Sequence, residues 1–238
     1  MKKKSQITVF MVLGIFIFLL ITGLHFIVSN IGGNAIFQSI GDAEAEFKAG
    51  LQGCLKIAGE EALKKVSLHG RINAQDGLAY RSVKVYYAEP AITKQQMEQE
   101  ISGLVNDNFR QCSGEIASEF EKRGLKIKNA EPAASAALNE NDVSISANYP
   151  ISFSFGQESR QFGDFIENYN VRLLKMLSIA EKVSIDYKNM KKLNMTYLSN
   201  IGMDTVVFPY ETALLIVLED QESGIRELNY AYSFAVKE

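Results

Sequence analysis

The chain has 238 residues, of which 47% are hydrophobic and 22% are charged, and its formal net charge is −3. This length suffices for one or two domains with a sizeable core, and the composition excludes a disordered or fibrous chain. The weak acidic balance argues against nucleic acid as a partner, because its phosphates require clustered Lys and Arg. Two cysteines, two histidines and no tryptophan provide little material for a metal site or a His-based catalytic centre. We therefore expect no cofactor and no enzymatic activity.

The N-terminal segment has the pattern of a membrane anchor. Three lysines at positions 2–4 precede residues 7–28, an apolar run without a single charged side chain. A helix over this run spans roughly 33 Å, enough for a hydrocarbon core of about 30 Å. Because basic residues stay on the cytoplasmic side, we expect residues 1–6 in the cytoplasm and the chain after residue 28 outside it. The lipid bilayer is thus the first expected partner.

A cleavable secretory signal is the first alternative for this segment. Such a signal has an apolar region of only about 7–15 residues, followed by a small-x-small cleavage site. The run at 7–28 is longer, and the residues after it, Ser29-Asn30-Ile31, make a poor site. This comparison favours a retained transmembrane helix.

Processing on the cytoplasmic side is the second alternative. The segment Lys3-Lys4-Ser5-Gln6-Ile7-Thr8 resembles the class III signal sequences of archaeal pilin-like proteins. In that family a peptidase cuts between a small residue and a Gln and leaves the apolar helix in place, so the resemblance implies Ser5 and Gln6 as the processing site. The sequence departs from the family in having Ser5 where Gly is usual and Phe10 where an acidic residue often stands.

The first part of the exported chain, about 36–123, has helical periodicity. After a short linker at 29–35, apolar residues recur every three or four positions from Ile36 to Val66, and His69-Gly70 ends this helix. Glycines within it, at positions 41, 50, 53 and 59, permit close approach of a neighbour. A strand is expected over 80–88. A second helix begins with a Thr93/Gln96 capping box and ends at Gly124.

The second part, about 124–238, has mainly the period of strands. Strands are expected at 125–128, 143–155, 205–208, 213–218 and 228–236, with a turn at 221–224 and one more helix over 173–187. Pro150 lacks an N–H group, so it marks an edge or a bulge. The fold class is therefore α+β: an N-terminal transmembrane helix followed by an extracytoplasmic domain of amphipathic helices and antiparallel β-hairpins at 36–238.

The two cysteines, Cys54 and Cys112, lie on the apolar stripes of the two helices. In an oxidising compartment such thiols normally pair, and a disulfide would close a loop of about 59 residues and stabilise the fold by about 4 kcal/mol. The alternative is two separate buried thiols, because free Cys packs as a small hydrophobe. Two distant cysteines and one histidine outside the span are too few ligands for zinc.

Motifs that carry chemistry are otherwise missing. The sequence contains no GxSxG, HExxH, P-loop or GxGxxG pattern. The cluster Asn139-Glu140-Asn141-Asp142 lacks the spacing of a calcium loop and is interpreted as a hairpin turn. Lys188, Lys191 and Lys192 are interpreted as a solvated helix end, and Tyr230 and Tyr232 as sheet core. Asn194-Met195-Thr196 is the one N-x-S/T sequon, which export would make available for glycosylation.

Taken together, the chain resembles a group of uncharacterised archaeal membrane-anchored proteins with pilin-like N-termini. The resemblance is carried by Ser5-Gln6, the apolar anchor and the segments "CLKIAGEEAL" and "ENDVSISANYPISF", and it implies no catalytic residues. The leading hypothesis is a single-pass envelope protein that binds other envelope proteins or itself through edge strands. A pilin-like subunit of a surface filament is the alternative, and a surface hydrolase is a third hypothesis with no motif behind it.

Overall fold

The computed structural model describes residues 39–73, 77–80, 83–88, 91–210 and 212–237. Over these residues the protein is α+β, with helices packed on antiparallel sheets, which confirms the predicted class at this level. Within the described ranges, no helix is both long enough and apolar enough to cross a membrane. The predicted span at 7–28, the linker and the predicted processing site Ser5-Gln6 lie outside the described residues.

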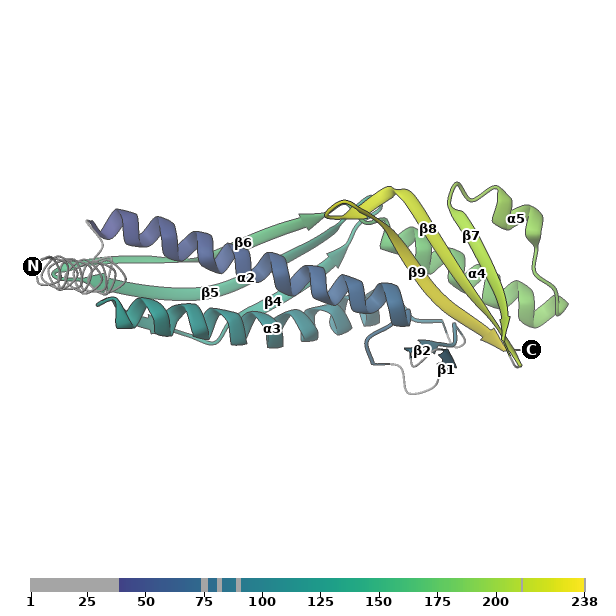
Figure 1. Ribbon diagram of the computed structural model, residues 1–238, viewed down its shortest axis with the longest axis horizontal. Helices are drawn as coiled ribbons and strands as arrows, with labels where there is room; N and C mark the ends of the chain where they lie inside the picture. The colour runs from purple at the N-terminus through teal and green to yellow at the C-terminus, as the bar shows by residue number, and fades with distance from the viewer. Residues whose placement is uncertain (1–38, 74–76, 81–82, 89–90, 211, 238) are drawn as a thin grey trace, which may run out of the picture.

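The elements form an elongated molecule with a sheet toward each end (Figure 1). The helices are α2 (Ile40–His69), α3 (Lys94–Lys122), α4 (Leu173–Met190) and α5 (Met195–Ser199). The strands are β1 (Gly77–Tyr80), β2 (Val83–Tyr86), β3 (Lys126–Asn129), β4 (Ala133–Leu138), β5 (Val143–Phe155), β6 (Glu158–Tyr169), β7 (Asp204–Tyr210), β8 (Ala213–Ile225) and β9 (Leu228–Lys237). We call the end where α2 begins the proximal end, and the end where β7 meets β8 the distal end.

The proximal sheet is built around β5. Strands β3 and β4 pair with successive parts of one edge of β5, and β6 pairs with the other edge. Side chains of β5 alternate, so that its apolar set from Val143 to Phe153 is buried under α2 and α3 while its serines lie on the opposite face. The register shifts between Asn148 and Ile151, which confirms a bulge at Pro150.

The outer edge of β4 is closed by α3. Three polar side chains on successive turns of α3 bond to the backbone of this strand. Asn106 binds both the N–H and the C=O of Ala134, Ser102 accepts from the N–H of Ala136, and Glu98 accepts from the N–H of Leu138. These bonds use the backbone groups that an open edge strand would offer to another chain.

The distal sheet has the order β7-β8-β9. One face shares the main core with α4 and with the C-terminal half of α2, and the β1–β2 hairpin covers part of the other face. The chain after β2 also touches β9, since the N–H of Ala88 donates to the carbonyl of Ala235 over 2.9 Å.

Helix α2 is long enough, at about 45 Å, to pack on both sheets. In its second half, Gly59 lies directly against Tyr169 and Ile145 of the proximal sheet. Further along, the carbonyl groups of Leu63 and Gly70 accept hydrogen bonds from the hydroxyls of Tyr230 and Tyr232 on β9. The expectation that a glycine permits close approach is therefore confirmed at Gly59.

Several elements differ from the sequence predictions. Strands β1, β4 and β6 and helix α5 were not predicted. The strand expected over 80–88 is observed in part as β2, which pairs with β1. The turn expected at 221–224 is wrong: β8 continues to Ile225 through a register shift, and β9 begins at Leu228. The polar residues there suggested a turn because their buried contacts, described below, are not visible in sequence.

The close packing at Gly59 yields a prediction. A Cβ at this position would lie 2.8 Å from Cδ1 of Ile145 and still closer to the hydroxyl of Tyr169. We expect Gly59→Ala to lower the free energy of unfolding by about 1–3 kcal/mol through overpacking. Gly53→Ala is the matched control in the same helix, because a Cβ there meets nothing within 4 Å, and it should raise stability by up to about 1 kcal/mol. Denaturant unfolding of both variants measures the difference; equal effects would contradict this account.

Candidate functional site

The two cysteines form the link between α2 and α3. Cys54 and Cys112 lie with their sulfur atoms 1.95 Å apart and their Cα atoms 5.7 Å apart, as a disulfide. Because both helices cover the same face of the proximal sheet, this bond holds the helical layer together.

A hollow of about 280 Å³ lies over this disulfide. Glu61, Asn108 and Glu115 line it, and the side-chain amide of Asn108 donates to Glu61 over 2.9 Å. Ligand pockets usually measure about 300–1,000 Å³ and are mostly apolar, whereas this hollow is open and acidic. It offers no arrangement of nucleophile and base.

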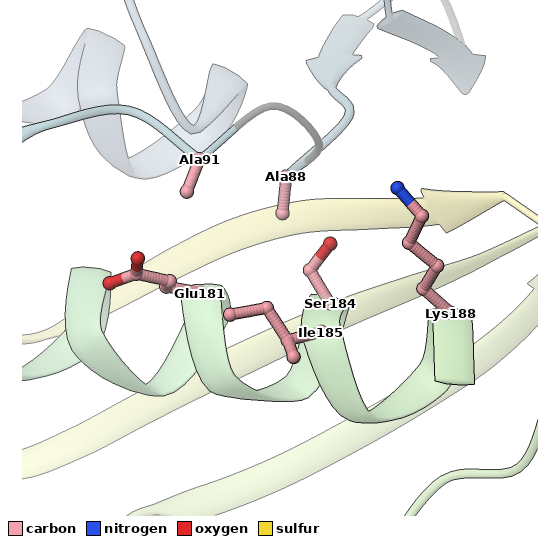
Figure 2. Close-up of a pocket in the computed structure, with 6 residues that line it drawn as sticks. All are labelled: Ala88, Ala91, Glu181, Ser184, Ile185 and Lys188. Atoms are coloured by element: carbon pink, nitrogen blue, oxygen red, sulfur yellow. The ribbon is translucent and has the colours of Figure 1, made fainter. Parts of the chain in front are cut away.

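A second hollow, of about 110 Å³, lies between α4 and the chain after β2. Figure 2 shows Ala88 and Ala91 facing Ser184 and Ile185 of α4, with Glu181 toward one end of the hollow and Lys188 toward the other. The volume is well below that of a pocket for a metabolite. Across the described ranges, no group of three or more His, Cys, Asp or Glu side chains is arranged to hold a metal ion.

Buried polar groups join the elements rather than line a cavity. Asp220 on β8 is fully buried and accepts from the guanidinium of Arg172 at 2.8 and 2.5 Å, from the hydroxyl of Ser223 at 2.5 Å and from the N–H of Glu222. Burial alone would raise the pKa of Asp220, but these hydrogen bonds outweigh it and the pKa is lowered. Arg172 also contacts Glu222, so this network fastens the start of α4 to the irregular part of β8.

A second buried carboxylate, Glu60 on α2, pairs with Arg226 in the β8–β9 turn. Nε of Arg226 lies 2.7 Å from Oε2 of Glu60, which is only 3% exposed. Arg226 has φ 58°, a left-handed conformation that costs a non-glycine residue roughly 1–2 kcal/mol. The strained backbone of this turn is thus at Arg226, whose side chain neutralises the buried charge of Glu60.

Other residues singled out in the sequence lie in turns, in the core or at a helix end. The cluster at 139–142 is the β4–β5 turn, in which the side chain of Asn139 donates to Asp142 over 2.7 Å. Tyr230 and Tyr232 belong to the sheet core, as predicted, and burial raises the pKa of both hydroxyls, so they remain protonated donors. Lys191 is the left-handed C-cap of α4.

The outer strand β7 carries two exposed apolar side chains at an edge of the distal sheet. It pairs with β8, and no strand in the described part of the chain pairs with its other edge. Val206 and Phe208 remain 45% and 42% exposed. Tyr80 of the β1–β2 hairpin stacks on Phe208 at 6.5 Å between ring centroids and meets Tyr210 edge-on at 5.2 Å. We call these four residues the β7 surface.

The β7 surface faces away from the main core. Val207, the residue between Val206 and Phe208, packs with Leu198 of α5 against the main core. Because successive side chains of a strand point to opposite faces, Val206 and Phe208 lie on the other face of the distal sheet. Sequence reasoning found the strand, but nothing in the pattern showed that it is outermost or that Tyr80 joins it.

Comparison of the chain with protein-family models, with curated proteins and with solved structures finds no match.

The Asp220 network predicts a pH-dependent contribution to stability. Because the pKa of Asp220 is lowered in the fold, its stabilisation is present above the unfolded value of about 3.9 and is lost as the pH falls below it. We expect Asp220→Asn to lower the free energy of unfolding by about 3–5 kcal/mol at pH 7, with a smaller difference from the wild type at pH 3.

Glu222→Gln is the matched control for this measurement. Glu222 contacts the same Arg172, but its side chain is 74% exposed, so its loss should cost less than about 1 kcal/mol. Denaturant titrations of both variants at several pH values provide the comparison. An Asp220→Asn deficit that is constant from pH 7 to pH 3 would contradict the assignment.

Proposed function

We propose that this protein is a single-pass membrane protein whose domain lies outside the cytoplasm and binds a protein partner through the β7 surface. The apolar run at 7–28 with lysines before it supports the anchor and its orientation. The exposed apolar edge strand is the observation that carries the binding role.

The disulfide supports the location. Disulfides persist in oxidising compartments and are rare in the cytosol, where thiols are kept reduced. Cys54 and Cys112 are the only cysteines of the chain, so the disulfide leaves no free thiol.

The shape of the domain supports the position of the binding surface. Helix α2 begins shortly after the predicted span, at the proximal end, whereas β7 lies toward the distal end (Figure 1). An anchor before α2 leaves the distal sheet as the part of the domain farthest along the molecule from the anchored end. This is where a membrane-attached domain meets a partner without steric conflict with the bilayer.

The chemistry of β7 supports strand addition as the binding mode. An edge strand offers unpaired backbone N–H and C=O groups to a strand of another chain, and side chains on the exposed face add apolar contacts and specificity. Val206 and Phe208 provide the apolar contacts, and Tyr80 and Tyr210 are aromatic residues of the kind enriched at protein interfaces. Pro209 limits the bonding to part of the strand, because it has no N–H.

Thiol labelling of intact cells tests the location. We expect a membrane-impermeant maleimide to leave the full chain unlabelled, and to label Cys112, the less buried of the two cysteines, after treatment with an impermeant reductant. Labelling that requires cell lysis but no reductant would place reduced cysteines in the cytoplasm and overturn the proposal. Cys54→Ser, which leaves one thiol, should be labelled on intact cells without reductant and serves as the control.

Photo-crosslinking tests the binding surface. A photoreactive amino acid in place of Phe208 should give a discrete protein adduct on intact cells, because this side chain is at the proposed interface. The matched control is the same substitution at Leu228, an apolar residue at the start of β9 that is 74% exposed. Equal adducts at both positions, or none at Phe208, would contradict the role of β7. An adduct with the mass of two copies identifies the partner as a second copy, as the filament alternative expects.

A further inference from the structure

We infer that Asn194 is an N-glycosylation site. The oligosaccharide is transferred to it from a lipid phosphate. The inference rests on the proposed function in one respect, because the transfer requires the domain to lie outside the cytoplasm. It adds a covalent modification that the binding role neither requires nor implies.

The acceptor motif is placed at the surface of the fold. Asn194-Met195-Thr196 is the one N-x-S/T sequence of the chain, and all three residues are exposed. They lie at the start of α5, a five-residue helix between α4 and β7 (Figure 1). Glycosylated sequons occupy surface segments because the attached sugar is bulky and solvated. The surroundings of Asn194 meet this requirement.

Hydrogen bonding leaves the reactive atom available. Oδ1 of Asn194 accepts from the N–H of Tyr197 over 3.0 Å, which holds the side chain in one orientation. Nδ2 of Asn194 makes no hydrogen bond within the part of the chain that the structure describes, and the same is true of the hydroxyl of Thr196. By contrast, the side-chain amides of Asn106 and Asn170 donate to backbone carbonyls.

The transfer of the oligosaccharide to Asn194 requires no oxidant or reductant. Nδ2 of Asn194 attacks the anomeric carbon of the oligosaccharide and forms a C–N bond. The bond between that carbon and the phosphate oxygen breaks, the lipid phosphate leaves with the bonding electron pair, and the amide nitrogen loses one proton. The Asn194 side chain remains an amide, so Oδ1 keeps its acceptor role toward Tyr197.

The glycan and the β7 surface lie on opposite sides of the distal sheet. Leu198 of α5 packs in the main core with Val207, whereas Val206 and Phe208 point to the other face. A sugar on Asn194 therefore covers the side that carries α5 and leaves the β7 surface open. The modification and strand addition are sterically compatible.

Mass spectrometry of the full chain purified from membranes of its native cells tests the inference. We expect that, after digestion with trypsin, the peptide that begins after Lys192 carries the mass of a saccharide on Asn194. Asn194→Asp should abolish the modification while it keeps the cap, because a carboxylate oxygen accepts from Tyr197 as the amide oxygen does. Thr196→Ala should also abolish it, and Thr196→Ser, which restores the sequon, should retain it.

Thiol labelling of the same cells separates failure of this inference from failure of the proposed function. An external disulfide together with an unmodified Asn194 overturns glycosylation and leaves the proposed function standing. Reduced cysteines in the cytoplasm overturn both. A saccharide that persists in Asn194→Asp is attached elsewhere and also overturns the assignment.

Discussion

The packing of one long helix on two sheets is the constraint on which the rest of the fold depends. Helix α2 meets the proximal sheet at Gly59, where a Cβ atom would overlap the hydroxyl of Tyr169. It meets β9 through backbone carbonyls that accept hydrogen bonds from buried tyrosines. Between these contacts, Glu60 is neutralised by Arg226 from the β8–β9 turn. Helix α2 therefore packs on both sheets. The charged and polar groups where the sheets meet stabilise this packing.

The edge strands β4 and β7 are covered differently, and this difference supports the proposed function. Along the outer edge of β4, backbone N–H groups donate to the side chains of Glu98, Ser102 and Asn106 of α3. Among the described residues no strand pairs with the outer edge of β7, and Val206 and Phe208 on this strand are exposed. Because open apolar edges favour association, natural proteins usually block them unless a partner occupies them. This contrast is why we propose β7, rather than β4, as the interface.

Much of the fold was predictable because its patterns are local. The capping box at Thr93, the apolar stripe of α2 and the alternation of β5 each depend on a few neighbouring residues, and the structure confirms them. Strand β4 was missed because its small residues, AASAAL, give only a weak alternation of apolar and polar side chains. What stabilises it is its pairing with β5 and its hydrogen bonds to α3, which are contacts between distant parts of the chain. The prediction of a turn at 221–224 was wrong because polar residues were taken as solvent-exposed. In the structure Asp220 and Ser223 are buried and bond to Arg172.

The sequence by itself determined the α+β class, the expectation of an anchor at 7–28 and the identity of the only two thiols that can pair, because periodicity, charge order and cysteine count are properties of the linear chain. Only the tertiary structure decided that the thiols lie within bonding distance, that β7 is outermost, and that Tyr80 joins Phe208 at its surface. These facts depend on contacts between residues far apart in the chain, and strand order and side-chain exposure follow from such contacts alone.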